Sequence, residues 1–158
     1  MPPLKGMDSG LNGELLKALW EAEQNSQIAL IGDKMADEIP LYAKSAPYKI
    51  NSTAKALEVI LKHVPTLEGS SVLLMRSDAF EVECPELRDA MRVARNAGLD
   101  IEVVPRLGSD SENGYPGFFE LVNDPGEETL YVPTLDERRY ACARIVVGYS
   151  IQPINPSI

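Results

Sequence analysis

Hydrophobic residues follow two different spacings along this chain, and together they predict alternating helices and short buried strands. Helical spacing is seen in residues 11–23, in residues 54–63, and in a segment that begins at Pro85 and stops at Gly98. Proline is tolerated in the first turn of a helix, and glycine is typical just after the last turn. Short apolar runs predict strands at residues 28–31, 71–75, 100–104, 129–132 and 141–149, and residues 118–122 predict a short helix.

This alternation predicts a layered α/β domain with at least some parallel strand pairing. One domain accounts for residues 1–158, since domains commonly run to about 100–200 residues. Residues 108–117 form a polar, Gly-rich loop that could bring Asp110 or Glu112 to a site. Residues 151–158 include two prolines and are not expected to continue a sheet. One hypothesis is that this tail lies across a neighbouring subunit.

Composition narrows the class of protein. With 44% hydrophobic and 25% charged residues, the chain is an ordinary globular sequence. No segment approaches the roughly 18 consecutive apolar residues of a membrane span, and the N-terminal residues do not form a signal peptide. Cys84 and Cys142 suggest neither a disulfide framework nor a metal knuckle. These features predict a soluble cytoplasmic protein.

The charge balance and the missing motifs exclude several functions. The net charge is −9, and the only dense basic pair is Arg138–Arg139, so nucleic acid is not an expected partner. The chain has no GxGxxG, GxxxxGK[ST] or GxSxG motif. Its single histidine, His63, lies at the end of a predicted helix, where stabilising the helix dipole is the simpler interpretation. A phosphate-binding module is the weakest candidate, because Gly32-Asp33 places a carboxylate after the first strand.

Four segments, taken in order, resemble the RbsD/FucU family of sugar mutarotases. Residues 11–19 are similar to the family's opening helix. Residues 28–33, followed by Ile39-Pro40, resemble its first strand, an aspartate and a downstream proline. Residues 56–61 with 72–75 resemble the next helix and strand, and residues 139–148 resemble the C-terminal strand, which also ends in glycine.

The resemblance implies a three-layer RbsD-like domain with a central, largely parallel or mixed sheet flanked by helices. It also implies a cytoplasmic isomerase that interconverts anomers or ring forms of a free monosaccharide and assembles as a homo-oligomeric ring, often a decamer. Mutarotation opens a hemiacetal by moving protons, so positioned acid and base groups suffice without a cofactor or metal. The segment around Tyr140 and the helix pattern resemble the fucose branch slightly more than the ribose branch.

The resemblance also assigns site residues. Asp33 and Tyr140 correspond to catalytic positions, and Asn25, Arg106 and Cys142 correspond to substrate-binding positions. Cys142 stands where the family has asparagine, and Asn25 stands where it has histidine. Asparagine cannot exchange a proton near pH 7, and loss of a general acid or base commonly slows a reaction by about 10²–10⁴-fold.

Each of these residues has a simpler interpretation. Asp33 could only form a turn or cap, and Tyr140 could be an ordinary amphipathic tyrosine at a strand start. Asn25 could end a helix with left-handed backbone, Arg106 could pair with one of many carboxylates, and Cys142 could be a small buried hydrophobe. The alternative function is therefore a family member that has lost catalysis and serves as a sugar-binding or structural ring protein.

Overall fold

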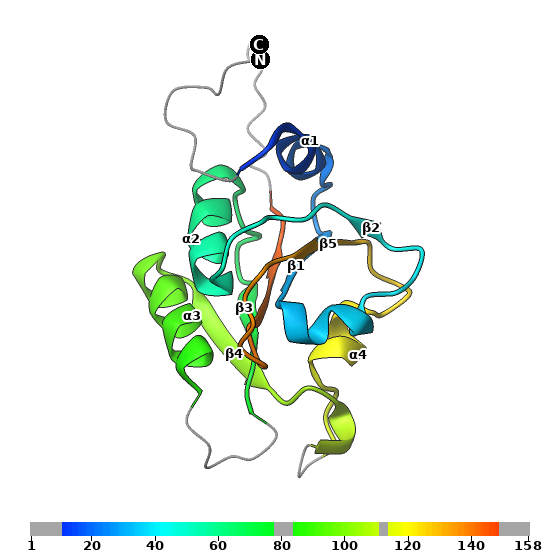
Figure 1. The fold of residues 1–158 in the computed structure, drawn as a ribbon, viewed down its shortest axis with the longest axis vertical. Coiled ribbons are helices and arrows are strands. Elements are labelled where there is room, and N and C mark those ends of the chain that lie inside the picture. The colour runs from blue at the N-terminus through cyan, green and yellow to red at the C-terminus, as the bar shows by residue number, and fades with distance from the viewer. Residues whose placement is uncertain (1–10, 78–83, 111–113, 149–158) are drawn as a thin grey trace.

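The protein forms a six-stranded mixed sheet with helices on both faces, described by a computed structural model for residues 11–77, 84–110 and 114–148 (Figure 1). The strands are β1 (Gln27–Ile31), β2 (Lys44–Ser45), β3 (Ser71–Met75), β4 (Asp100–Val104), β5 (Thr129–Pro133) and β6 (Cys142–Val146). Their spatial order is β2-β5-β1-β6-β3-β4. Only β6 runs against the others, between β1 and β3. The predicted layered α/β class is confirmed.

Helices cover the two faces of the sheet unequally. One face packs against α1 (Gly13–Glu21), α2 (Thr53–His63) and α3 (Pro85–Asn96), and the other against α4 (Phe118–Val122) and the 3₁₀ helix η1 (Asp33–Glu38). Side chains of β1 alternate between the two cores, so Ile28 and Leu30 lie in the first and Ala29 and Ile31 in the second. Because both faces are covered, β1 is buried at every position.

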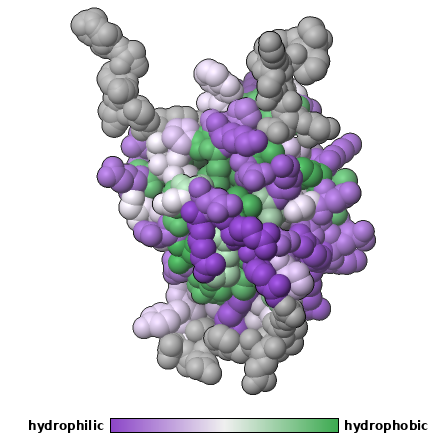
Figure 2. Space-filling model, turned by 90° about the vertical axis from the view of Figure 1, so that its left-hand side faces the viewer, coloured by the Kyte–Doolittle hydropathy of each residue, from purple (hydrophilic) through white to green (hydrophobic). Residues whose placement is uncertain are grey.

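Local sequence fixes where the helices begin. Asn12 Oδ1 accepts a hydrogen bond from the Leu15 N–H at 2.8 Å at the start of α1, and Ser52 Oγ accepts one from the Lys55 N–H at 3.2 Å at the start of α2. Pro85 opens α3, as the sequence predicts. Figure 2 views the molecule from the side of α2 and α3, and shows mainly hydrophilic side chains on that surface with hydrophobic ones between them.

Every predicted helix and strand is present, with bounds within about three residues of the prediction. The sequence analysis missed three short elements: η1, the edge strand β2, and the 3₁₀ turn η2 (Gly108–Asp110). Their residues carry no hydrophobic period, and β2 is defined by its pairing with β5. Glu112, Tyr149 and residues 151–158, for which the sequence made predictions, lie outside the described residues.

The sheet topology brings several chain segments to one edge. The parallel strands β1, β4 and β5 end at this edge, and the antiparallel strand β6 begins there. Ligands of open α/β sheets commonly bind beyond the carboxyl ends of the strands. The segments that follow these strand ends are therefore the first place to look for a site.

Candidate functional site

A cleft of about 530 Å³ lies at this edge of the sheet. Its volume is within the range of about 300–1,000 Å³ that is usual for small-molecule sites. The lining residues are Lys34, Met35, Asp37, Glu38, Arg106, Glu137 and Arg139. They come from η1 after β1, from the turn after β4, and from the connection between β5 and β6. The cleft therefore combines three cationic and three anionic side chains with one apolar side chain.

Glu38 and Arg106 form the only ion pair between these lining residues. Arg106 Nη1 donates to Glu38 Oε2 at 3.1 Å. The Arg106 side chain is 24% exposed and the Glu38 side chain 36% exposed. The main-chain oxygen of Glu38 also accepts a hydrogen bond from Asn123 Nδ2 at 3.3 Å, just after α4. Arg106 thus holds the Glu38 carboxylate, and Asn123 holds the main chain that carries it. Arg106 uses only Nη1 for hydrogen bonds with the described residues, and its buried Nε has no partner there.

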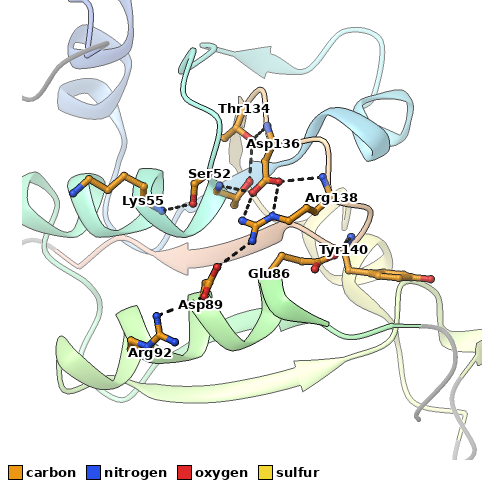
Figure 3. Close-up of polar contacts among 10 residues, drawn as sticks. Ser52, Lys55, Glu86, Asp89, Arg92, Thr134, Asp136, Arg138 and Tyr140 are labelled. Atoms are coloured by element: carbon orange, nitrogen blue, oxygen red, sulfur yellow. Dashed lines mark hydrogen bonds and ion pairs between the residues drawn. The ribbon is translucent and has the colours of Figure 1, made fainter. Parts of the chain in front are cut away.

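The connection between β5 and β6 alternates its side chains between the cleft and the protein interior. Glu137 and Arg139 are exposed and line the cleft. Asp136 is buried and Arg138 half-buried, and both point toward the starts of α2 and α3 (Figure 3). This alternation lets one short segment contribute to the cleft wall while it is anchored from behind.

Asp136 is the centre of that anchor (Figure 3). Its carboxylate is 1% exposed and accepts hydrogen bonds from the Thr53 N–H at 2.8 Å, from Arg138 Nε at 2.9 Å and from Arg138 Nη2 at 2.7 Å. Burial alone would raise the pKa of Asp136, but the hydrogen bonds from Arg138 and Thr53 outweigh it and lower the pKa. The same hydrogen bonds to Asp136 raise the pKa of Arg138. The pair is therefore fully ionised at neutral pH.

The first two turns of α3 supply a second anchor. Arg138 Nη1 donates to Asp89 Oδ2 at 3.0 Å, and the Tyr140 N–H donates to Glu86 Oε2 at 3.0 Å. Glu86 and Asp89 are three residues apart, so they lie on the same side of the helix. Residues near the starts of α2 and α3 thus hold the segment that carries Glu137 and Arg139.

The structure places three of the five predicted site residues at or beside the cleft. Arg106 lines it directly. Asp33 is exposed at the start of η1, next to the lining residue Lys34, and its N–H donates to the Asp136 main-chain oxygen at 2.8 Å. Tyr140 is half-buried, and its ring centre lies 5.8 Å from the guanidinium carbon of Arg139.

The structure does not bring the other two, Asn25 and Cys142, to the cleft. Asn25 lies in the turn before β1, and a five-residue strand spanning about 13 Å separates that turn from the cleft edge. Its φ of 73° shows the left-handed backbone of a turn residue. Cys142 is 3% exposed within the core beneath η1, and burial raises the pKa of its thiol to about 12. Neither residue lines this cleft, and their assignment as substrate-binding residues stays a prediction.

The sequence analysis missed six of the seven lining residues. Four of them lie in or beside η1, which has no hydrophobic period, and Glu137 and Arg139 lie in a segment read only as the approach to the last strand. One signal was available: polar residues follow the ends of several predicted strands, and parallel strand ends share one edge of a sheet.

Neither metal-binding clusters nor membrane spans are found in the parts of the chain that the structure describes. Within residues 11–77, 84–110 and 114–148, no group of three or more His, Cys, Asp or Glu side chains is arranged to hold a metal ion. No helix in those same ranges has the length and apolar character needed to cross a membrane.

Known structures share this fold, although no protein-family model and no curated protein sequence matches the chain. A fucose mutarotase from Streptococcus pneumoniae, solved with L-fucose, is 19% identical and has a TM-score of 0.71 over 94% of this chain and 100% of its own. FucU from Bifidobacterium longum is 17% identical, with a TM-score of 0.71 over 93% of this chain and 100% of its own. Bacillus subtilis RbsD, solved with D-ribose, is 14% identical, with a TM-score of 0.62 over 89% of this chain and 95% of its own. The chain therefore has the fold of the RbsD/FucU proteins.

Proposed function

We propose that the cleft binds a free monosaccharide and interconverts its anomers or ring forms by opening and closing the hemiacetal. The observation that carries this proposal is the set of charged donors and acceptors gathered in one cleft: Lys34, Arg106 and Arg139 against Asp37, Glu38 and Glu137. A sugar presents hydroxyl groups that donate and accept hydrogen bonds, so a cleft with both kinds of partner suits it. Mutarotation needs only proton transfer between positioned groups, so we expect no cofactor or metal requirement.

A fucose-like sugar is the better candidate substrate. Both fucose-type structures superpose on this chain more closely than the ribose-type structure, with TM-scores of 0.71 against 0.62. We further propose a cytoplasmic location for this activity. Within the proposed site, Arg106 and Arg139 bind sugar hydroxyls. Asp33 and Tyr140 take part in catalysis from the edge of the cleft.

The alternative is a protein that binds a sugar, or only builds a ring, without catalysing exchange. Two features favour it: by the resemblance, Asn25 stands where the family has a proton-exchanging histidine, and Cys142, which stands where the family has asparagine, is buried. Under this alternative the cleft still holds a sugar through Arg106, but no group transfers the proton.

Anomer exchange measured by NMR saturation transfer separates these functions. The purified chain is tested with L-fucose, D-ribose and a panel of other aldoses, with and without a metal chelator. We expect protein-dependent exchange that the chelator does not change, and weaker binding in Arg106→Met. Binding without exchange would establish the alternative, and neither binding nor exchange would contradict both functions.

A further inference from the structure

We infer that Glu38 is the group that carries the proton during ring opening, with Arg106 stabilising the charge that develops on the sugar. This inference rests on the proposed function and assigns a catalytic residue that the sequence analysis did not consider. It begins from the four carboxylates in or beside the cleft: Asp33, Asp37, Glu38 and Glu137.

Only one of these four carboxylates is held in place. Asp33, Asp37 and Glu137 are exposed, and none of their side chains forms a hydrogen bond with the described residues. Glu38 is half-buried, bonded to Arg106 at 3.1 Å, and fixed through its main-chain oxygen by Asn123. A proton carrier must hold one geometry through the reaction, because small misplacements of a catalytic group greatly reduce the rate. The Glu38 carboxylate meets this condition and the other three do not.

In the cleft, a proton acceptor and a hydrogen-bond donor lie side by side. The anomeric hydroxyl and the ring oxygen of a sugar are bonded to the same carbon, so the groups that serve them must also be neighbours. Glu38 Oε1 is not used by the Arg106 ion pair, and Arg106 Nη1 lies directly beside the carboxylate. A guanidinium presents only hydrogen-bond donors and a positive charge, so Arg106 suits the stabilisation of negative charge on the sugar.

The proton and electron movements balance with these two residues alone. Glu38 takes the proton of the anomeric hydroxyl, and the electron pair of that O–H bond forms the carbonyl. The bond between the anomeric carbon and the ring oxygen breaks, and its electron pair stays on the ring oxygen beside Arg106. Glu38 then returns the proton to that oxygen. Rotation of the free aldehyde and the same steps in reverse give the other anomer, with Glu38 again a carboxylate.

The test compares exchange and binding in matched variants. Glu38→Gln keeps the shape of the side chain and an oxygen that accepts from Arg106, but it cannot take a proton. We expect the exchange rate to fall by about 10²–10⁴-fold while the sugar dissociation constant stays within about threefold. Glu38→Asp keeps the carboxylate but sets it farther back on a shorter side chain, so its exchange rate should fall less. Glu68→Gln, an exposed carboxylate in the loop before β3, is the control and should exchange like the unmodified chain.

Each other outcome has a definite meaning. If the unmodified chain exchanges sugar and Glu38→Gln does so within about threefold, the role of Glu38 is wrong and the proposed function stands. If Asp33→Asn removes exchange instead, Asp33 is the proton carrier. If the unmodified chain exchanges no aldose, the proposed function fails and the proton transfer fails with it. Thermal unfolding of each variant shows that the comparison is between folded proteins.

Discussion

Arg138 joins the segment that carries Glu137 and Arg139 to the starts of two helices. Its guanidinium bonds to Asp136 in its own segment and to Asp89 in α3, and Asp136 in turn binds the first N–H of α2. Buried ion pairs add little net stability compared with apolar replacements, but removal of one partner leaves the other charge uncompensated. The main consequence of losing the Arg138 side chain would therefore be an uncompensated negative charge on buried Asp136.

Replacing Arg138 with methionine should destabilise the fold by about 3 kcal/mol, because the Asp136 carboxylate would stay buried without its guanidinium. The matched control is Arg92→Met. Arg92 pairs with the same Asp89 at 3.6 Å, but its side chain is 63% exposed, so we expect a change below about 1 kcal/mol. Urea unfolding measures both. Equal effects for the two variants would show that Asp136 does not depend on Arg138.

The lowered pKa of Asp136 makes a prediction about acid stability. The pKa of an aspartate is about 3.9 in the unfolded chain, and that of Asp136 is lower in the folded protein. Such a group stabilises the fold at pH values above its unfolded pKa. This contribution is lost as pH falls through the folded pKa. The free energy of unfolding should therefore fall less steeply below about pH 4 in Asp136→Asn than in the unmodified chain. Chemical denaturation at a series of pH values measures both slopes. Parallel slopes would mean that Asp136 does not contribute to the acid dependence.

The junction between β1 and η1 sets the position of the cleft relative to the sheet. Gly32 follows β1 directly and lies close to the backbone of Asp136 and Ala141. A Cβ atom there would lie 2.8 Å from the Ala141 main-chain oxygen and 3.2 Å from that of Asp136. Because these contacts are to backbone, they cannot be relieved by a side-chain rotation, and η1 would have to shift with its glutamate.

Gly32→Ala should therefore lower the free energy of unfolding by about 1–3 kcal/mol and weaken sugar binding as well. Gly13→Ala in α1 is the control, since a Cβ atom there meets nothing within 4 Å. It should stabilise the fold by about 0.4–1 kcal/mol. Calorimetry gives the affinities and urea unfolding the stabilities. A Gly32→Ala protein that binds sugar normally would show that the cleft tolerates movement of η1.

Helices and buried strands could be predicted from the sequence because each has a hydrophobic period and recognisable ends. Residues 71–75 and the helix beginning at Pro85 were predicted with their observed starts. The cleft was only partly predictable. Arg106 was found through resemblance, whereas Glu38 lies in a short 3₁₀ helix with no period, and its importance comes from a contact 68 residues away. Asn25 was also assigned through resemblance and does not line this cleft, because correspondence to a family position does not fix where a turn lies relative to it; its role stays a prediction.

Assembly into a homo-oligomer stays a prediction for this chain, and its surface offers one place to test it. Leu41 and Tyr42, just after η1, are 85% and 95% exposed. Adjacent exposed apolar side chains of this size often mark an interaction surface. Light scattering should give a mass above that of the monomer, and the double variant Leu41→Ser, Tyr42→Ser should lower it. Tyr115→Ser, at a side chain 67% exposed, is the control. A monomeric unmodified chain would contradict the predicted ring.

The most direct test of the account as a whole is the anomer exchange of L-fucose, followed by NMR saturation transfer with the unmodified chain. We predict exchange that rises in proportion to protein concentration and that disappears when an excess of a second bound aldose fills the cleft. An exchange rate equal to that of the sugar in buffer, for fucose and for every other aldose tested, would contradict the central claim that this cleft is a mutarotase site.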